Sequence, residues 1–246
     1  MKLYLTSSIG GNYIEGEIIK ACALDSSNHL LELLAKDWKE ECKCLILSSS
    51  PEDIEINESY RKIFLEAFSL SNLPLTCVDV CDARNEERIA DILYDYNVII
   101  LAGGHVPTQN AFLNRIHLKD LMNKYKGTVI GISAGSMNCA DIVYAQPELD
   151  GEAVDPLYDR YLEGLDLTKV NILPHFQYIK DICVDGLRVL EDISLPDSMI
   201  RPFYALVDGS FILVENNQTL LYGEAYWIQD GMISKVCDNN QVIHIG

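Results

Sequence analysis

The hydrophobic positions of this chain gather into short, nearly continuous apolar runs that are separated by longer amphipathic stretches. The runs occupy residues 3–5, 44–47, 75–78, 98–101 and 128–130. A strand that is apolar at almost every position is buried on both faces, as strands of parallel sheets are. These runs therefore predict strands of a buried, mainly parallel sheet.

The stretches between the runs place apolar residues at helical spacing, as Ile63, Phe64 and Ala67 do. A further helix is expected over residues 108–126, with Gly127 in the position of a C-terminal glycine. Strands that alternate with helices favour a sheet covered by helices on both faces. The predicted fold class is α/β, a three-layer sandwich.

The spacing of the apolar runs changes after residue 171. A short strand is expected at residues 172–173 and a helix over residues 178–190. Five closely spaced strands follow, at residues 203–207, 211–214, 219–222, 225–228 and 232–236. Asp-Gly and Asn-Asn turns between them predict a C-terminal antiparallel meander. Since no repeat or linker interrupts the chain, we expect residues 1–246 to form one domain.

The composition of the chain limits the kinds of protein and the partners that can be expected. The chain has 246 residues, of which 48% are hydrophobic, so it can bury a sizeable core. Its net charge of −18, from 37 acidic and 19 basic residues, repels phosphate groups. We therefore expect neither nucleic acid nor a membrane as partner. No run approaches the roughly 20 apolar residues that span a bilayer, and residues 1–6 look like a strand, not a signal peptide. A cytoplasmic monomer or homodimer is expected.

Eight cysteines raise the question of disulfides or a metal site. The pairs Cys42/Cys44 and Cys77/Cys81 lack the spacing of a zinc site, and no second pair of cysteines or histidines completes either one. Cysteines among apolar neighbours commonly act as small hydrophobic residues. We therefore expect reduced, structural thiols and no metal.

The most specific chemical signal is the sequence Gly-Ile-Ser-Ala-Gly at residues 131–135, directly after an apolar run. A Gly-x-Ser-x-Gly turn between a strand and a helix holds a serine hydroxyl at the tip of a sharp bend. Its glycines allow close backbone approach and unusual dihedral angles. This pattern predicts Ser133 as a nucleophile.

A nucleophilic serine needs a base, an orienting acid and an oxyanion hole. His175 follows the strand expected at residues 172–173, and Asp208 lies in a turn between two apolar runs. They are the best candidates for base and acid, although a structural hydrogen bond and an ordinary hairpin turn would also explain them. The N–H groups of Ala134 and of Gly104, within a glycine pair that follows another strand, could form the oxyanion hole. That pair is equally compatible with a plain strand-to-helix turn.

Three of these features together resemble a known family. They are the Gly-Gly pair at residues 103–104, the turn at 131–135 and Pro-His-Phe at 174–176. In this order they resemble peptidase family S51, serine peptidases that include aspartyl dipeptidase (peptidase E) and cyanophycinase. The resemblance implies a class I glutamine amidotransferase-like fold of the flavodoxin type, and catalysis without metal or cofactor.

The resemblance also implies roles for individual residues. Ser133 would be the nucleophile, His175 the general base, and Gly104 with Ala134 the oxyanion hole. The third member of the family's triad is an acid, a glutamate in aspartyl dipeptidase, and its position falls on Asp208.

The chain departs from the family's pattern near the substrate. The family commonly reads Gly-Gly-Asn-Thr-Phe after the strand, whereas this chain has Gly-Gly-His-Val-Pro at residues 103–107. The arginine-bearing insertion of aspartyl dipeptidase after the histidine is lacking. His105 and Arg160 are weak candidates for substrate contact, and a surface ion pair is the simpler explanation for Arg160. A preference for an N-terminal aspartate therefore stays open, as does the choice between exo- and endo-cleavage.

The function predicted from the sequence is hydrolysis of small peptides through a covalent acyl-serine. Two alternatives remain. An esterase of the α/β-hydrolase type would use the chain order serine, acid, histidine, which His244 could supply after Asp208. A catalytically silent sandwich that binds a small ligand is the other.

Overall fold

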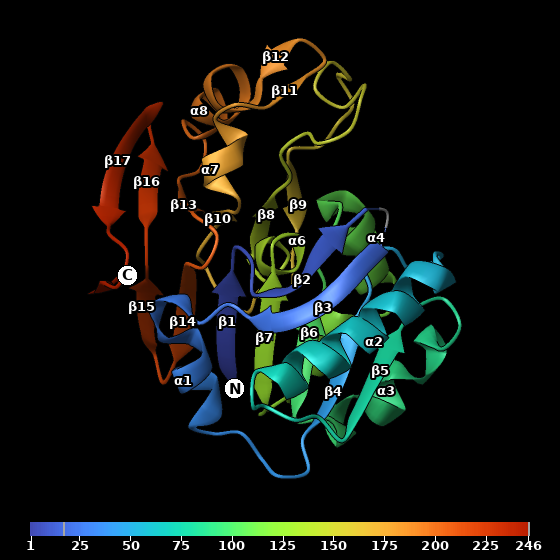
Figure 1. Cartoon of the computed structure of the whole chain (residues 1–246). Coiled ribbons are helices and arrows are strands. Elements are labelled where there is room, and N and C mark those ends of the chain that lie inside the picture. Colours follow the sequence, from blue (N-terminus) through green and yellow to red (C-terminus); the bar gives the residue numbers. More distant parts are fainter. Residues whose placement is uncertain (17, 246) are drawn as a thin grey trace.

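The structure is a computed structural model that describes residues 1–16 and 18–245. Its largest element is a central sheet of eight strands (Figure 1). The strand order is β18-β15-β14-β1-β7-β6-β4-β5. From β1 onward the neighbours pair in parallel, and on the other side of β1 they pair antiparallel. The strands are β1 (Lys2–Thr6), β4 (Lys43–Leu47), β5 (Cys77–Cys81), β6 (Val98–Leu101), β7 (Thr128–Ile132), β14 (Phe211–Glu215), β15 (Gln218–Tyr222) and β18 (Val242–His244).

The inner strands of this sheet are buried on both faces, because their alternate side chains enter two different apolar clusters. In β1, Leu3 and Leu5 belong to one apolar cluster and Tyr4 belongs to the other. The cluster around Tyr4 is covered by α1 (Leu30–Ala35), α2 (Ile54–Leu70) and the hairpin of β2 (Gly10–Glu15) and β3 (Ile18–Leu24). Figure 1 shows α2 and this hairpin in front of the strands. The opposite face is covered by α3 (Ile89–Ile92), α4 (Val106–Arg115), α5 (Leu118–Met122) and α6 (Ala134–Met137). The predicted three-layer α/β sandwich is confirmed.

The helix predicted over residues 108–126 is divided into α4 and α5. His117 adopts a left-handed conformation (φ 51°) between them and ends the regular hydrogen bonding. The new helix axis lets Leu118 and Met122 enter the same apolar cluster as Phe112. Helical spacing of apolar residues alone did not reveal this change of direction.

All five C-terminal strands are present, but they join two different sheets. The second sheet has the order β10-β13-β16-β17, and only β14 and β15 extend the central one, together with β18. The chain leaves the central sheet after the β14–β15 hairpin, and β16 then pairs with β13. The strands of the second sheet are β10 (Ile172–Leu173), β13 (Phe203–Leu206), β16 (Ala225–Gln229) and β17 (Met232–Cys237).

The helix predicted over residues 178–190 is wrong. Only α7 (Phe176–Ile179) is α-helical there, and a hairpin of β11 (Cys183–Val184) and β12 (Leu187–Arg188) follows. Asp185 and Gly186 form its turn with φ values of 53° and 80°, the positive angles that a tight hairpin needs. This turn signal outweighed the helical spacing.

Short elements complete the fold. They are β8 (Ile142–Tyr144), β9 (Tyr161–Glu163), α8 (Leu195–Asp197), a π-helical turn η4 (Val189–Ser194), and the 3₁₀ turns η1 (Ser27–His29), η2 (Glu86–Arg88) and η3 (Leu93–Asp95). Within residues 1–16 and 18–245, no helix combines the length and apolarity that crossing a membrane requires. All eight cysteines are free thiols, and burial raises the pKa of Cys42 to about 11.

Gly135 has no room for a side chain, because an added Cβ would lie 2.1 Å from the carbonyl oxygen of Leu101 on β6. We expect Gly135→Ala to destabilise the protein by about 3 kcal/mol or more, since overpacking against backbone forces α6 away from the sheet. The urea unfolding midpoint, followed by circular dichroism, measures this loss. Gly103→Ala is the matched control, because its nearest new contact would be 3.4 Å. Equal stability of the two variants would contradict the packing described for α6.

Candidate active site

Ser133 lies at a sharp bend between β7 and α6. Its dihedral angles, φ 49° and ψ −113°, are unusual for a serine, and such conformations persist only where surrounding contacts hold them. The carbonyl oxygen of Thr6, the last residue of β1, accepts hydrogen bonds from the Ser133 N–H (3.0 Å) and from the Ser136 hydroxyl (2.9 Å). The Ser136 hydroxyl also accepts from the Thr6 N–H at 2.8 Å. The end of β1 therefore fixes the bend.

His175 and Asp208 come together because they follow neighbouring strands. β10 and β13 pair in parallel, so their carboxyl ends meet at one edge of the second sheet, with His175 and Asp208 just beyond them. His175 Nδ1 lies 2.7 Å from Asp208 Oδ1. A carboxylate accepts hydrogen bonds, so this contact assigns the imidazole proton to Nδ1 and leaves Nε2 as an acceptor.

Ser7 joins the histidine to the carboxylate, and its role was not predicted from the sequence. Its hydroxyl donates to Asp208 Oδ1 (2.7 Å) and accepts from the His175 N–H (2.8 Å). Gln177 Oε1 accepts from the Asp208 N–H at 3.1 Å. The available signal was position alone, since Ser7 follows the first apolar run, at the end of a strand where polar residues of a site commonly lie.

Asp208 is held in its ionised form. Partial burial acts to raise the pKa of its carboxyl group, but hydrogen bonds from His175 and Ser7 outweigh this effect, and the pKa lies below its ordinary value. An ionised Asp208 fixes the orientation of the imidazole and can stabilise an imidazolium ion.

The glycine pair after β6 lies beside Ser133. The Gly103 carbonyl oxygen accepts from the Ser49 hydroxyl at 2.6 Å, so the next N–H, that of Gly104, points away from Ser49 across the trans peptide. A Cβ at Gly104 would lie 2.4 Å from Ser49 Oγ, which explains why glycine is needed. Within the described part of the chain, neither the Gly104 N–H nor the Ala134 N–H donates a hydrogen bond to a protein atom. Both are free to bind an oxyanion.

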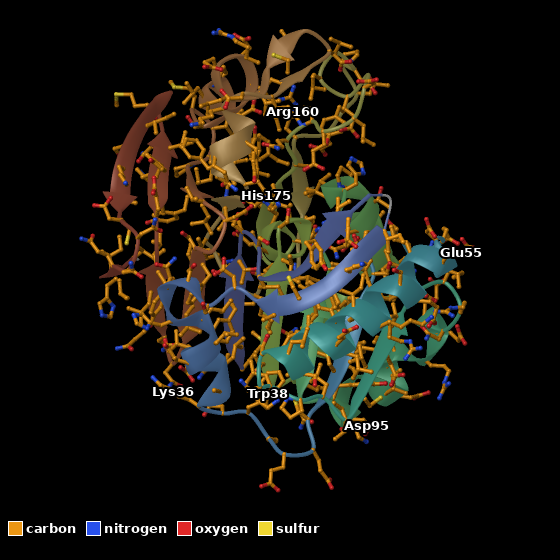
Figure 2. The ribbon with its side chains drawn as sticks, in the orientation of Figure 1. Lys36, Trp38, Glu55, Asp95, Arg160 and His175 are labelled. Atoms are coloured by element: carbon orange, nitrogen blue, oxygen red, sulfur yellow. The ribbon has the colours of Figure 1, made fainter. Side chains whose placement is uncertain are left out.

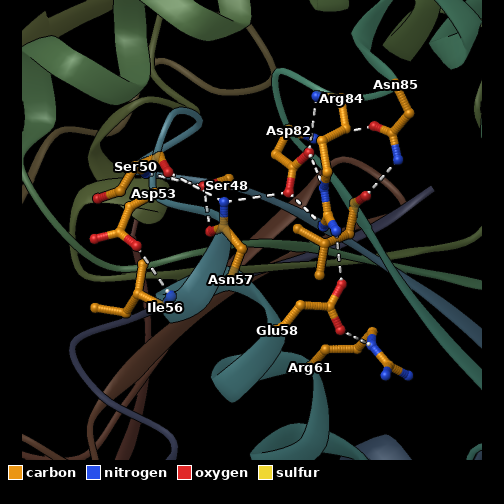
Figure 3. Close-up of polar contacts among 11 residues, drawn as sticks. Ser48, Ser50, Asp53, Ile56, Asn57, Glu58, Arg61, Asp82, Arg84 and Asn85 are labelled. Carbon is orange, nitrogen blue, oxygen red and sulfur yellow. Dashed lines mark hydrogen bonds and ion pairs between the residues drawn. The ribbon is translucent and has the colours of Figure 1, made fainter.

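A polar network holds the loop that carries Ser49 (Figure 3). Asn57 accepts from the Ser48 hydroxyl (2.7 Å) and donates to the Ser50 carbonyl oxygen (3.1 Å). Its amide also contacts Asp82, a fully buried carboxylate that is paired with Arg84. The loop is therefore anchored to the ends of β4 and β5, next to the glycine pair.

Ser133, His175 and Gly104 line one pocket of about 390 Å³. Its other lining residues are Gln146, Pro147, Glu148, Pro174, Ile179, Ile182, Val184 and Val189. No hydrogen bond joins the Ser133 and His175 side chains among the residues described. In hydrolases without substrate such contacts are often long, and they tighten when substrate binds. Within residues 1–16 and 18–245, no group of His, Cys, Asp and Glu side chains has the arrangement of a metal site.

The two weak candidates for substrate contact lie outside the pocket lining. His105 contacts the Thr108 hydroxyl through Nδ1 and Glu152 Oε1 through Nε2, each at 2.8 Å. Arg160 forms an ion pair with Asp197 at 2.8 Å, which agrees with the simpler interpretation of this residue. Figure 2 shows Arg160 well above His175 in the view.

His244 is exposed in β18, where it pairs with Leu220 at the edge of the central sheet. It does not line the pocket that contains Ser133.

Comparison with known proteins shows which family and which solved structures this chain resembles. The sequence model of peptidase family S51 matches residues 28–222. No curated protein sequence matches the chain. The structure is similar to the crystal structure of a peptidase from an acI-B1 Actinobacterium, with a TM-score of 0.67 and 13% identity over 99% of this chain and 96% of that one. It is also similar to a Listeria monocytogenes EGD-e protein provisionally named peptidase E, with a TM-score of 0.54 and 16% identity over 96% and 98% of the two chains. At these identities the structural similarity shows the fold.

The lowered pKa of Asp208 predicts a pH-dependent contribution to stability. A carboxyl group whose pKa is lower in the folded than in the unfolded state stabilises the fold above its unfolded pKa of about 3.9. This stabilisation is lost as the pH falls through the folded pKa. We expect Asp208→Asn to lower the melting temperature at pH 7 and to lose this difference toward pH 3.

Melting curves of wild type and variant between pH 3 and pH 7 measure this effect. Asp150→Asn, at an exposed position, is the control for removal of one negative charge. If the melting temperatures of wild type and Asp208→Asn differed by the same amount at every pH between 3 and 7, the contacts described for Asp208 would be contradicted.

Proposed function

Because the chain belongs to peptidase family S51, we propose that it is a serine peptidase that hydrolyses small peptides through Ser133, His175 and Asp208. The observation that carries this proposal is the hydrogen bond between His175 Nδ1 and Asp208 Oδ1, beside a pocket that Ser133 also lines. This bond leaves Nε2 as the acceptor that a general base needs. The pocket's volume lies toward the lower end of the range for small ligands, which favours a short peptide as substrate.

The first half-reaction forms an acyl-enzyme. Ser133 Oγ attacks the peptide carbonyl carbon while His175 Nε2 takes the hydroxyl proton. The carbonyl oxygen becomes an oxyanion that accepts hydrogen bonds from the N–H groups of Gly104 and Ala134. When the C–N bond breaks, His175 gives its proton to the leaving amine, and the acyl group stays on Ser133.

The second half-reaction repeats these steps with water as nucleophile. His175 takes a proton from water, the hydroxide attacks the acyl carbon, and Ser133 leaves with the proton from His175. During both steps the carboxylate of Asp208 stabilises the imidazolium ion, and the Ser7 hydroxyl keeps that carboxylate in place. Every group that moves a proton is thus a side chain of this chain.

The direct test is Ser133→Ala, assayed with a library of dipeptides. Turnover is expected to fall about a million-fold, because a triad acts as a unit and losing one member disables it. Liberated amine, measured against time, gives the rate. If the Ser133→Ala variant hydrolysed dipeptides at the wild-type rate, the proposal would be rejected.

Two histidine variants separate this mechanism from the order serine, acid, histidine. His175→Ala should abolish turnover, whereas His244→Ala, at an exposed edge strand, should leave it unchanged. The opposite result would assign the base to His244 and indicate an esterase-like arrangement.

A further inference from the structure

The proposed catalytic groups do not use every charged side chain of the pocket. Glu148 lines the pocket together with Ser133 and His175. It belongs to the segment that follows β8, between Ser133 and His175 in the sequence, and part of its surface is exposed. The charge of Glu148 therefore faces the space that a substrate would enter.

A second glutamate fixes the backbone of this segment. Glu152 Oε2 accepts hydrogen bonds from the N–H groups of Glu148 (2.9 Å) and Leu149 (3.0 Å). Its other oxygen, Oε1, lies 2.8 Å from His105 Nε2, in the loop that carries the glycine pair. Glu152 thus uses both oxygens to hold Glu148 at the pocket, beside the proposed oxyanion hole.

Three carboxylates of the polar contacts described above have a cationic partner, whereas Glu148 has none in the part of the chain that the structure describes. Asp208 is paired with His175, Glu152 with His105 and Asp197 with Arg160. Across residues 1–16 and 18–245, no lysine, arginine or histidine lies within ion-pair distance of the Glu148 carboxylate.

The surroundings of Glu148 disfavour its isolated charge. Crowding by protein atoms and the nearby charge of Glu152 raise the pKa of Glu148 to about 7, although His175 acts in the opposite direction. A bound cation would relieve this unfavourable environment.

Across the pocket the lining is apolar. Ile179, Ile182, Val184 and Val189 supply this wall, from α7 to the π-helical turn after the β11–β12 hairpin. An acidic side chain that lay against this apolar surface or the Glu148 carboxylate would find no favourable contact at either one. An apolar side chain beside a cationic group fits both walls.

We infer that Glu148 is a specificity-determining residue, whose carboxylate binds a cationic group on the residue that supplies the acyl part of the scissile bond. This inference rests on the proposed function, because Ser133 defines where the scissile carbonyl lies. The cation is an ammonium or guanidinium group, from either the free N-terminus or a basic side chain. An aspartate side chain at this residue is repelled by Glu148, so Asp-Leu is expected to bind less tightly than Leu-Leu.

Binding to the inactive Ser133→Ala protein tests the inference without turnover. Four probes are titrated by calorimetry: Leu-Leu, N-acetyl-Leu-Leu, N-acetyl-Lys-Leu and Asp-Leu. Leu-Leu or N-acetyl-Lys-Leu is expected to bind about tenfold to a hundredfold more tightly than N-acetyl-Leu-Leu, the gain typical of a hydrogen bond to a charged group. Preference for Leu-Leu identifies the N-terminal ammonium as the cation, and preference for N-acetyl-Lys-Leu identifies the side chain.

Adding Glu148→Gln to the inactive protein should remove the difference in affinity between the preferred cationic probe and N-acetyl-Leu-Leu. The matched control is Asp150→Asn, which removes one negative charge from the same segment at an exposed position and should preserve the difference. The inference is overturned if N-acetyl-Leu-Leu binds as well as both cationic probes, if neither cationic probe binds, or if Glu148→Gln leaves the difference unchanged.

Hydrolysis by the wild-type protein distinguishes the two levels of the proposal. If the wild type cleaves N-acetyl-Leu-Leu as fast as both Leu-Leu and N-acetyl-Lys-Leu, the inference about Glu148 fails while the proposed function stands. If the wild type cleaves none of the four while its Ser133→Ala variant binds cationic peptides through Glu148, the proposed function fails and the cation site stands.

Discussion

The carboxyl end of β1 is the point on which the whole candidate site depends. The carbonyl oxygen of Thr6 holds the bend at Ser133, and the next side chain, Ser7, bonds both to Asp208 and to the His175 backbone. Ser133 comes from the central sheet, whereas His175 and Asp208 come from the second sheet. Two consecutive residues, the last residue of β1 and the one that follows it, therefore set the position of the serine relative to the histidine and the carboxylate.

This arrangement explains why an unfavourable backbone conformation is tolerated at Ser133. Non-glycine residues at such dihedral angles cost about 1–3 kcal/mol, and the contacts with Thr6, together with the close approach of Gly131 and Gly135 to their neighbours, hold the bend. Among the residues that the structure describes, the bend leaves the Ala134 N–H without a protein acceptor, and the Gly104 N–H has none either. The strain and the proposed oxyanion hole thus have the same origin.

The sequence predicted the parts of this structure that depend on local chemistry. Continuous apolar runs predicted the central strands, and the Gly-x-Ser-x-Gly pattern placed Ser133 at the strand end where it is found. His175 and Asp208 were singled out because each follows a short apolar run, and the structure places them within hydrogen-bond distance. Their catalytic roles remain a proposal.

Features that depend on distant partners could not be predicted. Ser7 can contact Asp208 only because β1 ends beside the second sheet. The residues near Ser7 in the sequence do not indicate that the two sheets meet there. The backbone of Glu148 is bound by Glu152, which also contacts His105, 47 residues before it in the chain. The β11–β12 hairpin was missed because its apolar residues also fit helical spacing, and the positive φ angles of Asp185 and Gly186 decided between the two.

The most direct test of this account is the site at which a fluorophosphonate attaches. The reagent phosphonylates a serine that a neighbouring base has activated, and peptide mapping by mass spectrometry locates the added group. The account predicts one equivalent of label on Ser133, and none when His175 is replaced by alanine. Label on Ser7, Ser49 or Ser136 in place of Ser133, or no label on the wild-type protein, would contradict it.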